Sequence, residues 1–392
     1  MESNHNLTDE DWQDMELAQQ YRLSLSSSPS QSSFRVLALL FFELLEEEES
    51  TSAKSLPILV IPMMNETNPK GNGGGSRKYI VGTNDEPGYM GGAICAERAA
   101  MVQLRFAPPH KLTKVVISTD SEDPISPGLL CREFLAGHAK QVPWDLRVIS
   151  EGCICARCGR RDNELLECFS KKCSDDHEHH AVKLLETTIA ELYPFPSPYT
   201  RLTAKESTEL GEVYSGMDRA MNDLLELDAS VKRVLEVALL EARSKVDDGQ
   251  GDLHPIHFGA AVVFEDGTIA SARQSNALEF GCTLDAVSQL ATHIQESSSP
   301  PLLIVQADQY GIAHAPFAPA RAFLTERGYG DCHVLIHDTA PADQLHVNVV
   351  DQSTIQGWVL RTVAASELAP NPPSWASSDE TDQSSTANKL LC

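Results

Sequence analysis

The stretch GGAICAERAAM, residues 91–101, places a cysteine and a glutamate two positions apart at the start of a predicted helix. A carboxylate near a helix N-terminus is stabilised by the helix dipole, and a small buried cysteine is common in protein cores. The same pair can instead serve chemistry, with Cys95 binding a metal and Glu97 moving protons beside it. The surrounding sequence decides between these two interpretations.

Segments typical of strands alternate with segments typical of helices around this stretch. Thr8 and Asp11 form a capping pattern that predicts an N-terminal helix. Apolar, β-branched runs predict strands, and amphipathic runs predict helices. The expected strands are residues 33–42, 78–82, 114–119 and 145–150, and the expected helices are residues 94–106, 127–139 and 180–193. This alternation indicates an α/β sandwich.

The second half of the chain repeats the same order of elements. From residue 230 onward a helix, a hairpin with an EDG turn, a helix, a strand, a helix and a strand follow one another. A repeated order of this kind indicates an internal duplication. We therefore expect a duplicated three-layer α/β/α sandwich with a mixed sheet in each half.

Composition limits the partners of the protein. The 392 residues carry a formal net charge of −25, which disfavours binding to nucleic acid. No apolar run is long enough to cross a membrane, and the N-terminal residues lack the apolar segment of a signal peptide. The ten cysteines are clustered, which suits metal binding in a reducing compartment. We expect a cytoplasmic protein that acts on a small, uncharged molecule.

Four segments in the first half resemble the cytidine deaminase family, in the order that the family has them. They are SSFRV (32–36), GTNDE (82–86), CAER (95–98) and the proline-rich LYPFPSPY (192–199). The resemblance implies a cytidine-deaminase-like fold, a nucleoside substrate and a catalytic Zn²⁺. It also implies hydrolytic removal of ammonia from C4 of cytosine.

The resemblance assigns a role to each matching residue of this chain. Cys95 and Cys131 would bind zinc, Glu97 would be the general acid and base, and Arg98 would moderate the charge of the thiolates. Asn84 and Glu86 would hold the ribose hydroxyls, and Phe34 would pack against the pyrimidine. The backbone at Ala96 and Ser126 would contact the base.

One position departs from the family pattern. The family has a P-C-x-x-C motif, whereas this chain has Pro127-Gly128-Leu129-Leu130-Cys131, so Gly128 stands where a third zinc ligand is expected. A catalytic zinc usually has three protein ligands and one water. Either another residue supplies the third ligand, or the site binds metal weakly, or it binds none.

A cysteine- and histidine-rich insert at residues 152–180 offers a second metal site. Its Cys155-x-x-Cys158 pair has the spacing of a zinc knuckle, and Cys168 with Cys173 could complete a four-sulfur structural Zn²⁺ site. His177, His179 and His180 compete for the same ligand positions, and a polar surface insert with incidental cysteines is the alternative.

The second half has lost the chemistry of the first. Asp285-Ala286-Val287 stands at the CAE position, and Asp285 reads best as a helix cap. The predicted domains are a catalytic one at 8–202, a linker at 203–227, a degenerate repeat at 228–362 and a disordered tail at 363–392. The resemblance further implies a homodimer.

Two functions therefore compete. The first is cytidine or deoxycytidine deamination in pyrimidine salvage. The second is a non-catalytic pseudo-deaminase that acts as a zinc-binding scaffold or regulatory subunit. Glu97, Asn84 and Glu86 favour the enzyme, and Gly128 favours the scaffold.

Overall fold

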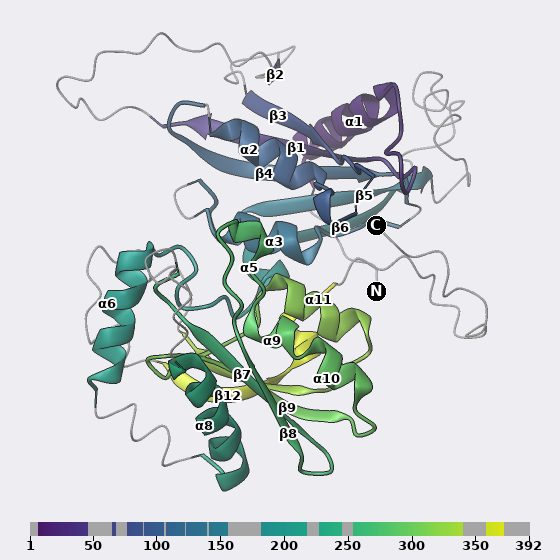
Figure 1. Ribbon diagram of the computed structural model, residues 1–392. Helices are drawn as coiled ribbons and strands as arrows, with labels where there is room; N and C mark the ends of the chain where they lie inside the picture. Colours follow the sequence, from purple (N-terminus) through teal and green to yellow (C-terminus); the bar gives the residue numbers. More distant parts are fainter. Residues whose placement is uncertain are drawn as a thin grey trace, which may run out of the picture. The chain divides into compact units, whose positions relative to one another are not determined.

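The computed structural model describes residues 7–45, 65–67, 77–88, 90–105, 107–121, 123–138, 141–155, 182–217, 227–244, 254–339 and 358–371. The chain divides into two compact units, shown in Figure 1. Unit 1 is Met1–Glu191 with Asn371–Cys392, and unit 2 is Leu192–Pro370. Within the described ranges, every helix is too short or too polar to cross a membrane.

Unit 1 contains a six-stranded mixed sheet in the order β2-β3-β1-β4-β5-β6. Strands β4 and β5 are parallel, and the other neighbouring pairs are antiparallel. The elements are α1 (Asp9–Ser24), β1 (Val36–Leu44), β2 (Asn65–Thr67), β3 (Arg77–Thr83), η1 (Met90–Gly92), α2 (Ala96–Leu104), β4 (His110–Thr119), α3 (Leu129–Ala136), β5 (Arg147–Cys155), β6 (Val182–Thr188) and α5 (Ile189–Leu192).

Helices cover both faces of this sheet because the central strand β1 is buried on both sides. Leu37, Leu39 and Phe41 pack with Met15 of α1 on one face. The alternate residues of β1 point to the other face, where α2 lies. There Gly82 of β3 is needed for close packing, since a Cβ atom would lie 2.2 Å from the carbonyl oxygen of Ala96. This contact seats the first turn of α2 directly on the sheet.

Unit 2 contains a second mixed sheet in the order β12-β11-β9-β7-β8, with the short β10 paired to β9. Strands β9 and β11 are parallel, and the other pairs are antiparallel. The elements are α6 (Ala204–Ser215), α8 (Ala229–Arg243), β7 (Phe258–Phe264), β8 (Ile269–Arg273), η2 (Phe280–Cys282), α9 (Ala286–Gln289), α10 (Ala291–Glu296), β9 (Pro301–Asp308), β10 (Ala313–His314), α11 (Ala318–Glu326), β11 (His333–Asp338), β12 (Val359–Ala364) and η4 (Ala365–Leu368).

The two sheets share one strand order and one set of strand directions. Strands β3, β1, β4, β5 and β6 of unit 1 correspond to β8, β7, β9, β11 and β12 of unit 2. In unit 2, α8 packs against Ala261 and Val305, and α9 and α11 pack on the other face against Val262 and Ile304. The predicted duplicated α/β fold with mixed sheets is confirmed.

The prediction of a helix at residues 180–193 is wrong. Residues Val182–Thr188 form strand β6, and only Ile189–Leu192 turn into a short helix. Strand β6 pairs antiparallel with β5, with Thr188 opposite Arg147. Pairing with a neighbouring strand overrides the helical preference of the Lys-Leu-Leu-Glu run, which is a weak local signal.

The structure describes helices in parts of the predicted linker and of the predicted disordered tail. Residues 204–215 of the expected linker form helix α6, which begins with a capping box between Thr203 and Glu206. Leu210 and Tyr214 of this helix are buried in a cluster with Trp358. Residues 363–371 of the expected tail include the end of β12 and the buried η4. The rest of that tail lies outside the described residues.

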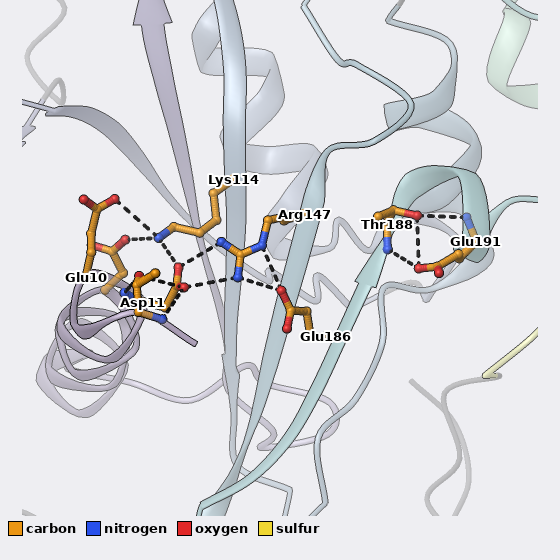
Figure 2. A network of polar contacts seen from close by, with 9 residues as sticks. Glu10, Asp11, Lys114, Arg147, Glu186, Thr188 and Glu191 are labelled. Carbon is orange, nitrogen blue, oxygen red and sulfur yellow. Dashed lines mark hydrogen bonds and ion pairs between the residues drawn. The ribbon is translucent and has the colours of Figure 1, made fainter. Parts of the chain in front are cut away.

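A partly buried polar network links α1 to the sheet of unit 1 (Figure 2). The Lys114 ammonium on β4 lies 2.6 Å from Asp11 Oδ1 and 2.5 Å from Asp14 Oδ2. Arg147 Nη2 on β5 lies 3.1 Å from Asp11 Oδ2 and 2.6 Å from Glu186 Oε1. The Lys114 side chain is 6% exposed and those of Asp11 and Asp14 are 1% exposed, so these charges depend on one another.

Replacing Lys114 by methionine should lower the free energy of unfolding of unit 1 by about 3 kcal/mol, because it leaves buried carboxylates without their ammonium partner. Urea unfolding followed by circular dichroism measures this loss. Lys111→Met, at an exposed position of the same strand, is the matched control and should change stability little. Equal stability of the two variants would contradict the structural role of the network.

The same network predicts how stability depends on pH. Burial alone would raise the pKa of Asp11, but hydrogen bonds from Lys114, Thr8 and Arg147 outweigh it and hold the pKa well below its ordinary value. The stabilisation from Asp11 is therefore present above the ordinary carboxyl pKa of about 4 and is lost as the pH falls toward the folded-state pKa. The stability difference between wild type and Asp11→Asn should shrink from pH 6 to pH 2 in urea titrations.

Candidate metal centre

Cys95 is the residue that begins helix α2. Its backbone is extended, with φ −79° and ψ 156°, and its carbonyl accepts the first helical hydrogen bond from Ala99 N at 3.0 Å. The side chain makes no capping hydrogen bond with the helix backbone. A bridge between Asp85 and Ile94 fixes the chain just before this helix. The thiol therefore has a fixed position at a helix N-terminus.

Glu97 and Cys131 lie beside this thiol. Glu97, in the first turn of α2, is 3% exposed, and Cys131, in the first turn of α3, is fully buried. The Cys95 and Cys131 sulfurs and a Glu97 carboxylate oxygen all lie within 4.8 Å of one another. Within the described ranges, this is the single group of three or more Cys, His, Asp or Glu residues arranged to hold a metal ion. The structure thus brings together the three residues that the sequence singles out, which are Cys95, Glu97 and Cys131.

The two thiols share a proton unequally. A hydrogen bond from the Cys131 thiol, with help from the charge of Arg98 and against the effect of burial, lowers the pKa of Cys95 to about 6. The same hydrogen bond and burial raise the pKa of Cys131 well above its ordinary value. Arg98 Nη2 lies 3.7 Å from Cys95 Sγ, consistent with the charge-moderating role predicted for it. The lowered pKa favours the thiolate form of Cys95, which is the form that binds metal.

The carboxyl group of Glu97 has a raised pKa. Burial, followed by the negative charge of Cys95, raises its pKa to about 7. A carboxyl group with this pKa is populated in both protonation states at neutral pH, as general acid–base catalysis requires.

The residues of this group fit a zinc ion, with two thiols as ligands and a carboxylate beside them, and Gly128 supplies no side chain at the position of the third predicted ligand. Thiolate sulfur and carboxylate oxygen are both zinc ligands in proteins. Gly128 is the N-cap of α3, with φ −61° and ψ 155°, and a Cβ atom placed on it would meet nothing within 4 Å. A side chain at this position is therefore compatible with both the backbone and the available space. Gly128 therefore supplies no metal ligand, but it leaves space for a side chain that could.

The two predicted ribose-binding residues, Asn84 and Glu86, form hydrogen bonds with other residues of the chain. Asn84 Nδ2 donates to Phe34 O at 2.8 Å and to Glu86 Oε1 at 3.3 Å, and Asn84 Oδ1 accepts from Val36 N at 2.8 Å. Glu86 is 7% exposed and accepts from Ser32 N at 2.8 Å and Ser32 Oγ at 2.7 Å. Both residues hold the loop that leads into β1, with Phe34 in this loop.

The remaining predicted contacts with the base are at Ala96, the first residue of α2, and at Ser126, shortly before the start of α3. Ala96 is fully buried in the first turn of α2. Ser126 is 4% exposed, and its Oγ donates to the carbonyl of Asn371 at 2.6 Å. Their roles in substrate binding stay predictions.

A buried arginine beside the site is absent from the sequence-based prediction. Arg132, fully buried in α3, donates from Nε to Pro127 O at 2.7 Å and from Nη2 to Ser126 Oγ at 2.6 Å. It fixes the loop that carries Gly128. Arg321 donates in the same way to Pro316 O at 2.7 Å in unit 2. The Pro-x₄-Arg spacing present in both repeats is the signal that could have revealed it.

The corresponding place in unit 2 has no such group. Asp285 caps α9 by accepting from Ser288 N at 2.9 Å, which confirms the helix-cap interpretation. Val287 and Ala320 occupy the positions of Glu97 and Cys131, and both are fully buried apolar residues. In unit 2, apolar side chains therefore pack at the positions where unit 1 has the carboxylate of Glu97 and the thiol of Cys131.

The predicted structural metal site lies mostly outside the described residues. Cys155 ends strand β5, and its side chain is not among those described. Cys158, Cys168 and Cys173 lie outside the described ranges, as do His177, His179 and His180. The second zinc site stays a prediction.

Substituting Val287 by alanine, or Asp285 by asparagine, should leave any deamination rate within about twofold of wild type, because neither repeat position carries a metal ligand or a proton shuttle in unit 2. Initial rates at saturating cytidine test this. The matched change in unit 1 is Glu97→Ala, which should remove activity. A large rate loss in the Asp285→Asn variant, with its fold intact by circular dichroism, would place chemistry in unit 2.

Comparison with known proteins gives a partial likeness. No protein-family profile and no curated protein matches the chain. The cytidine deaminase from Mycobacterium tuberculosis is similar over 37% of this chain and 98% of that chain, at 18% identity and a TM-score of 0.27. The cytidine deaminase from Burkholderia pseudomallei is similar over 48% of this chain and 98% of that chain, at 16% identity and a TM-score of 0.27. At these values, activity and substrate have to be argued from the chain's own residues.

Proposed function

We propose that unit 1 is a zinc-dependent deaminase of cytidine or deoxycytidine that acts in pyrimidine salvage. The observation that carries the proposal is the buried group of Cys95, Glu97 and Cys131, with ligand atoms within 4.8 Å of one another. A pair of thiols alone would suit a structural metal. The buried carboxyl group with a pKa of about 7 adds the proton transfer that hydrolysis needs.

In this proposal Cys95 and Cys131 hold the zinc, and Arg98 offsets part of the negative charge of the thiolates. When bound, the zinc would supply an activated water for hydrolysis. Glu97 accepts a proton and returns it to the amino group that leaves C4 of the base. The overall reaction consumes water and the nucleoside and gives the uridine product and ammonia.

A nucleoside suits this site better than a polynucleotide. The formal net charge of −25 opposes binding to a phosphate backbone. Asn84 and Glu86 are two positions apart just beyond the end of β3, and carboxylate oxygens can accept further hydrogen bonds besides those from Ser32. Ribose hydroxyl groups are donors that match this capacity. We further propose that the protein works as a homodimer in the cytoplasm.

The proposal is tested by two measurements on the same purified protein. The loss of cytidine ultraviolet absorbance measures turnover, and elemental analysis measures zinc per chain. Cys95→Ser should remove one zinc per chain and all turnover. Cys282→Ser, which changes an exposed free cysteine of unit 2, is the matched control and should change neither. A wild type that holds no zinc at Cys95, or holds it without converting cytidine or deoxycytidine, would defeat the proposal.

A second candidate function rests on a specific observation. Gly128 leaves the predicted third ligand position without a side chain, and Glu86 is engaged with Ser32. These features favour a non-catalytic pseudo-deaminase that serves as a scaffold or regulatory subunit. Zinc that depends on Cys95 without any turnover of either nucleoside would support this function over the enzyme.

A further inference from the structure

Unit 2 contains a cavity of about 460 Å³ that lies next to β8, the edge strand of its sheet. The cavity is bounded by the C-terminal end of α8 and the start of β7. The end of β8, the residues that follow it, and the helices α9 and α10 complete the boundary. Its volume is in the range of small-molecule sites. Its lining residues all belong to unit 2, whereas the thiol group belongs to unit 1.

The two repeats can be aligned residue by residue around this cavity. In unit 1 a bridge joins Asp85 to Ile94, and in unit 2 a bridge joins Ser275 to Leu284. The residue before each bridge donates its backbone N–H to the start of the central strand, from Asn84 N to Val36 O at 3.2 Å and from Gln274 N to Phe258 O at 2.9 Å. These equivalences show which residues changed between the repeats.

Two neutral residues of unit 1 correspond to basic residues that line the cavity. Arg273 occupies the position of Thr83, since each is the last residue of the strand before the bridge. His293 occupies the position of Gln103, eight residues after Cys95 or its counterpart Asp285. Both basic residues line the cavity.

Two acidic residues of unit 1 correspond to neutral residues in unit 2. Asn276 replaces Glu86 and lines the cavity. Gln309 replaces Asp120, because each donates its backbone N–H to the residue that precedes the central strand, Gln309 to His257 and Asp120 to Arg35, both at 3.2 Å.

This second exchange alters the charge next to the cavity. In unit 1, Asp120 Oδ2 lies 3.0 Å from Arg35 Nε, so a carboxylate neutralises the cation. In unit 2, Gln309 carries no charge, and its side chain bonds to His257 N at 2.7 Å and Pro255 O at 2.8 Å. His257, which lines the cavity, therefore lacks the neighbouring carboxylate that its counterpart Arg35 has in Asp120.

The hydrogen-bond donors of the cavity are accessible. Arg273, His257 and His293 are exposed side chains. Arg273 Nη1 makes a long hydrogen bond of 3.4 Å to Ser244 Oγ, which a stronger acceptor can replace. Glu241 is the acidic residue of the lining, and its carboxylate accepts from Ser271 Oγ at 2.7 Å.

We propose that this cavity binds a small organic phosphate, a phosphate monoester carried on a ring. The guanidinium of Arg273 is suited to a phosphate group, with the two imidazoles as further donors. The volume exceeds what a bare phosphate fills, and Phe258 and Ala272 provide apolar lining for the rest of the ligand.

Isothermal calorimetry on the full chain tests the site, with inorganic phosphate and cytidine monophosphate as charged probes and cytidine as the uncharged one. Both charged probes should bind, the organic phosphate more tightly. Arg273→Thr, which installs the unit 1 residue, should weaken both by about tenfold or more, the effect of a lost charge-assisted hydrogen bond. Arg233→Gln removes an exposed arginine of α8 elsewhere in unit 2 and should leave both affinities unchanged.

Asn276→Glu gives a second, independent readout, because it restores the carboxylate of unit 1 and should repel both charged probes. If circular dichroism shows that Arg273→Thr is unfolded, the Asn276→Glu variant alone decides the outcome. Neither variant should change any binding of cytidine, because cytidine carries no phosphate. Absence of saturable binding of either charged probe to wild type, or binding that the folded variants leave unchanged, would overturn it.

Discussion

Glu97→Gln should lower the rate of cytidine deamination by roughly 100- to 10,000-fold, the usual contribution of a general acid and base. Glutamine has nearly the same shape but cannot take up or release a proton near neutral pH. The zinc content should stay close to that of wild type, because the proposed ligands are Cys95 and Cys131. Turnover at saturating cytidine and zinc per chain, measured on one preparation, check both parts.

The control for Glu97→Gln has to remove a carboxylate without touching the site. Glu43→Gln, at an exposed position near the end of β1, meets this requirement and should keep wild-type turnover. Substantial turnover in Glu97→Gln would remove the proposed proton transfer. A large loss of zinc in that variant would instead show that Glu97 is itself a ligand, as its distance within 4.8 Å of both sulfurs allows.

The sequence predicts the centre of this site better than its surroundings. Cys95 and Glu97 are two residues apart at a helix start, so local geometry alone brings them together. Cys131 follows because its helix begins after the neighbouring strand in an alternating α/β order. The hydrogen bonds of Glu86 with Ser32 join residues 54 positions apart, and their geometry depends on a loop conformation that no local pattern specifies.

The fold shows the same division between local and non-local information. The capping pair Thr8 and Asp11 is read correctly, because both residues act within one turn. Strand β6 is missed, because its extended form depends on pairing with β5. Helix α6 is missed for a related reason: its Leu210 and Tyr214 are buried by Ile312 and Trp358, far away in the sequence.

Gly128→Cys should raise the affinity of unit 1 for zinc. Partners in the outer shell of a metal site already change affinity roughly 10- to 100-fold, and a direct thiolate ligand should do at least as much. The backbone accepts the change, since φ is −61° and a Cβ atom meets nothing within 4 Å. Competition with a zinc chelator measures the affinity, and turnover should rise wherever loss of zinc limits the wild type.

Gly128→Ser is the matched control, because serine has almost the same size but a hydroxyl group that binds zinc much more weakly than a thiolate. Tighter binding in the cysteine variant alone would show that the third ligand position is open in the wild type. Unchanged affinity in both variants would mean that another residue already fills it, with the cysteines of the 152–180 insert as the first to examine. In that case the glycine would be a substitution that the chain has compensated, and the buried Glu97 would still have a full set of zinc ligands beside it.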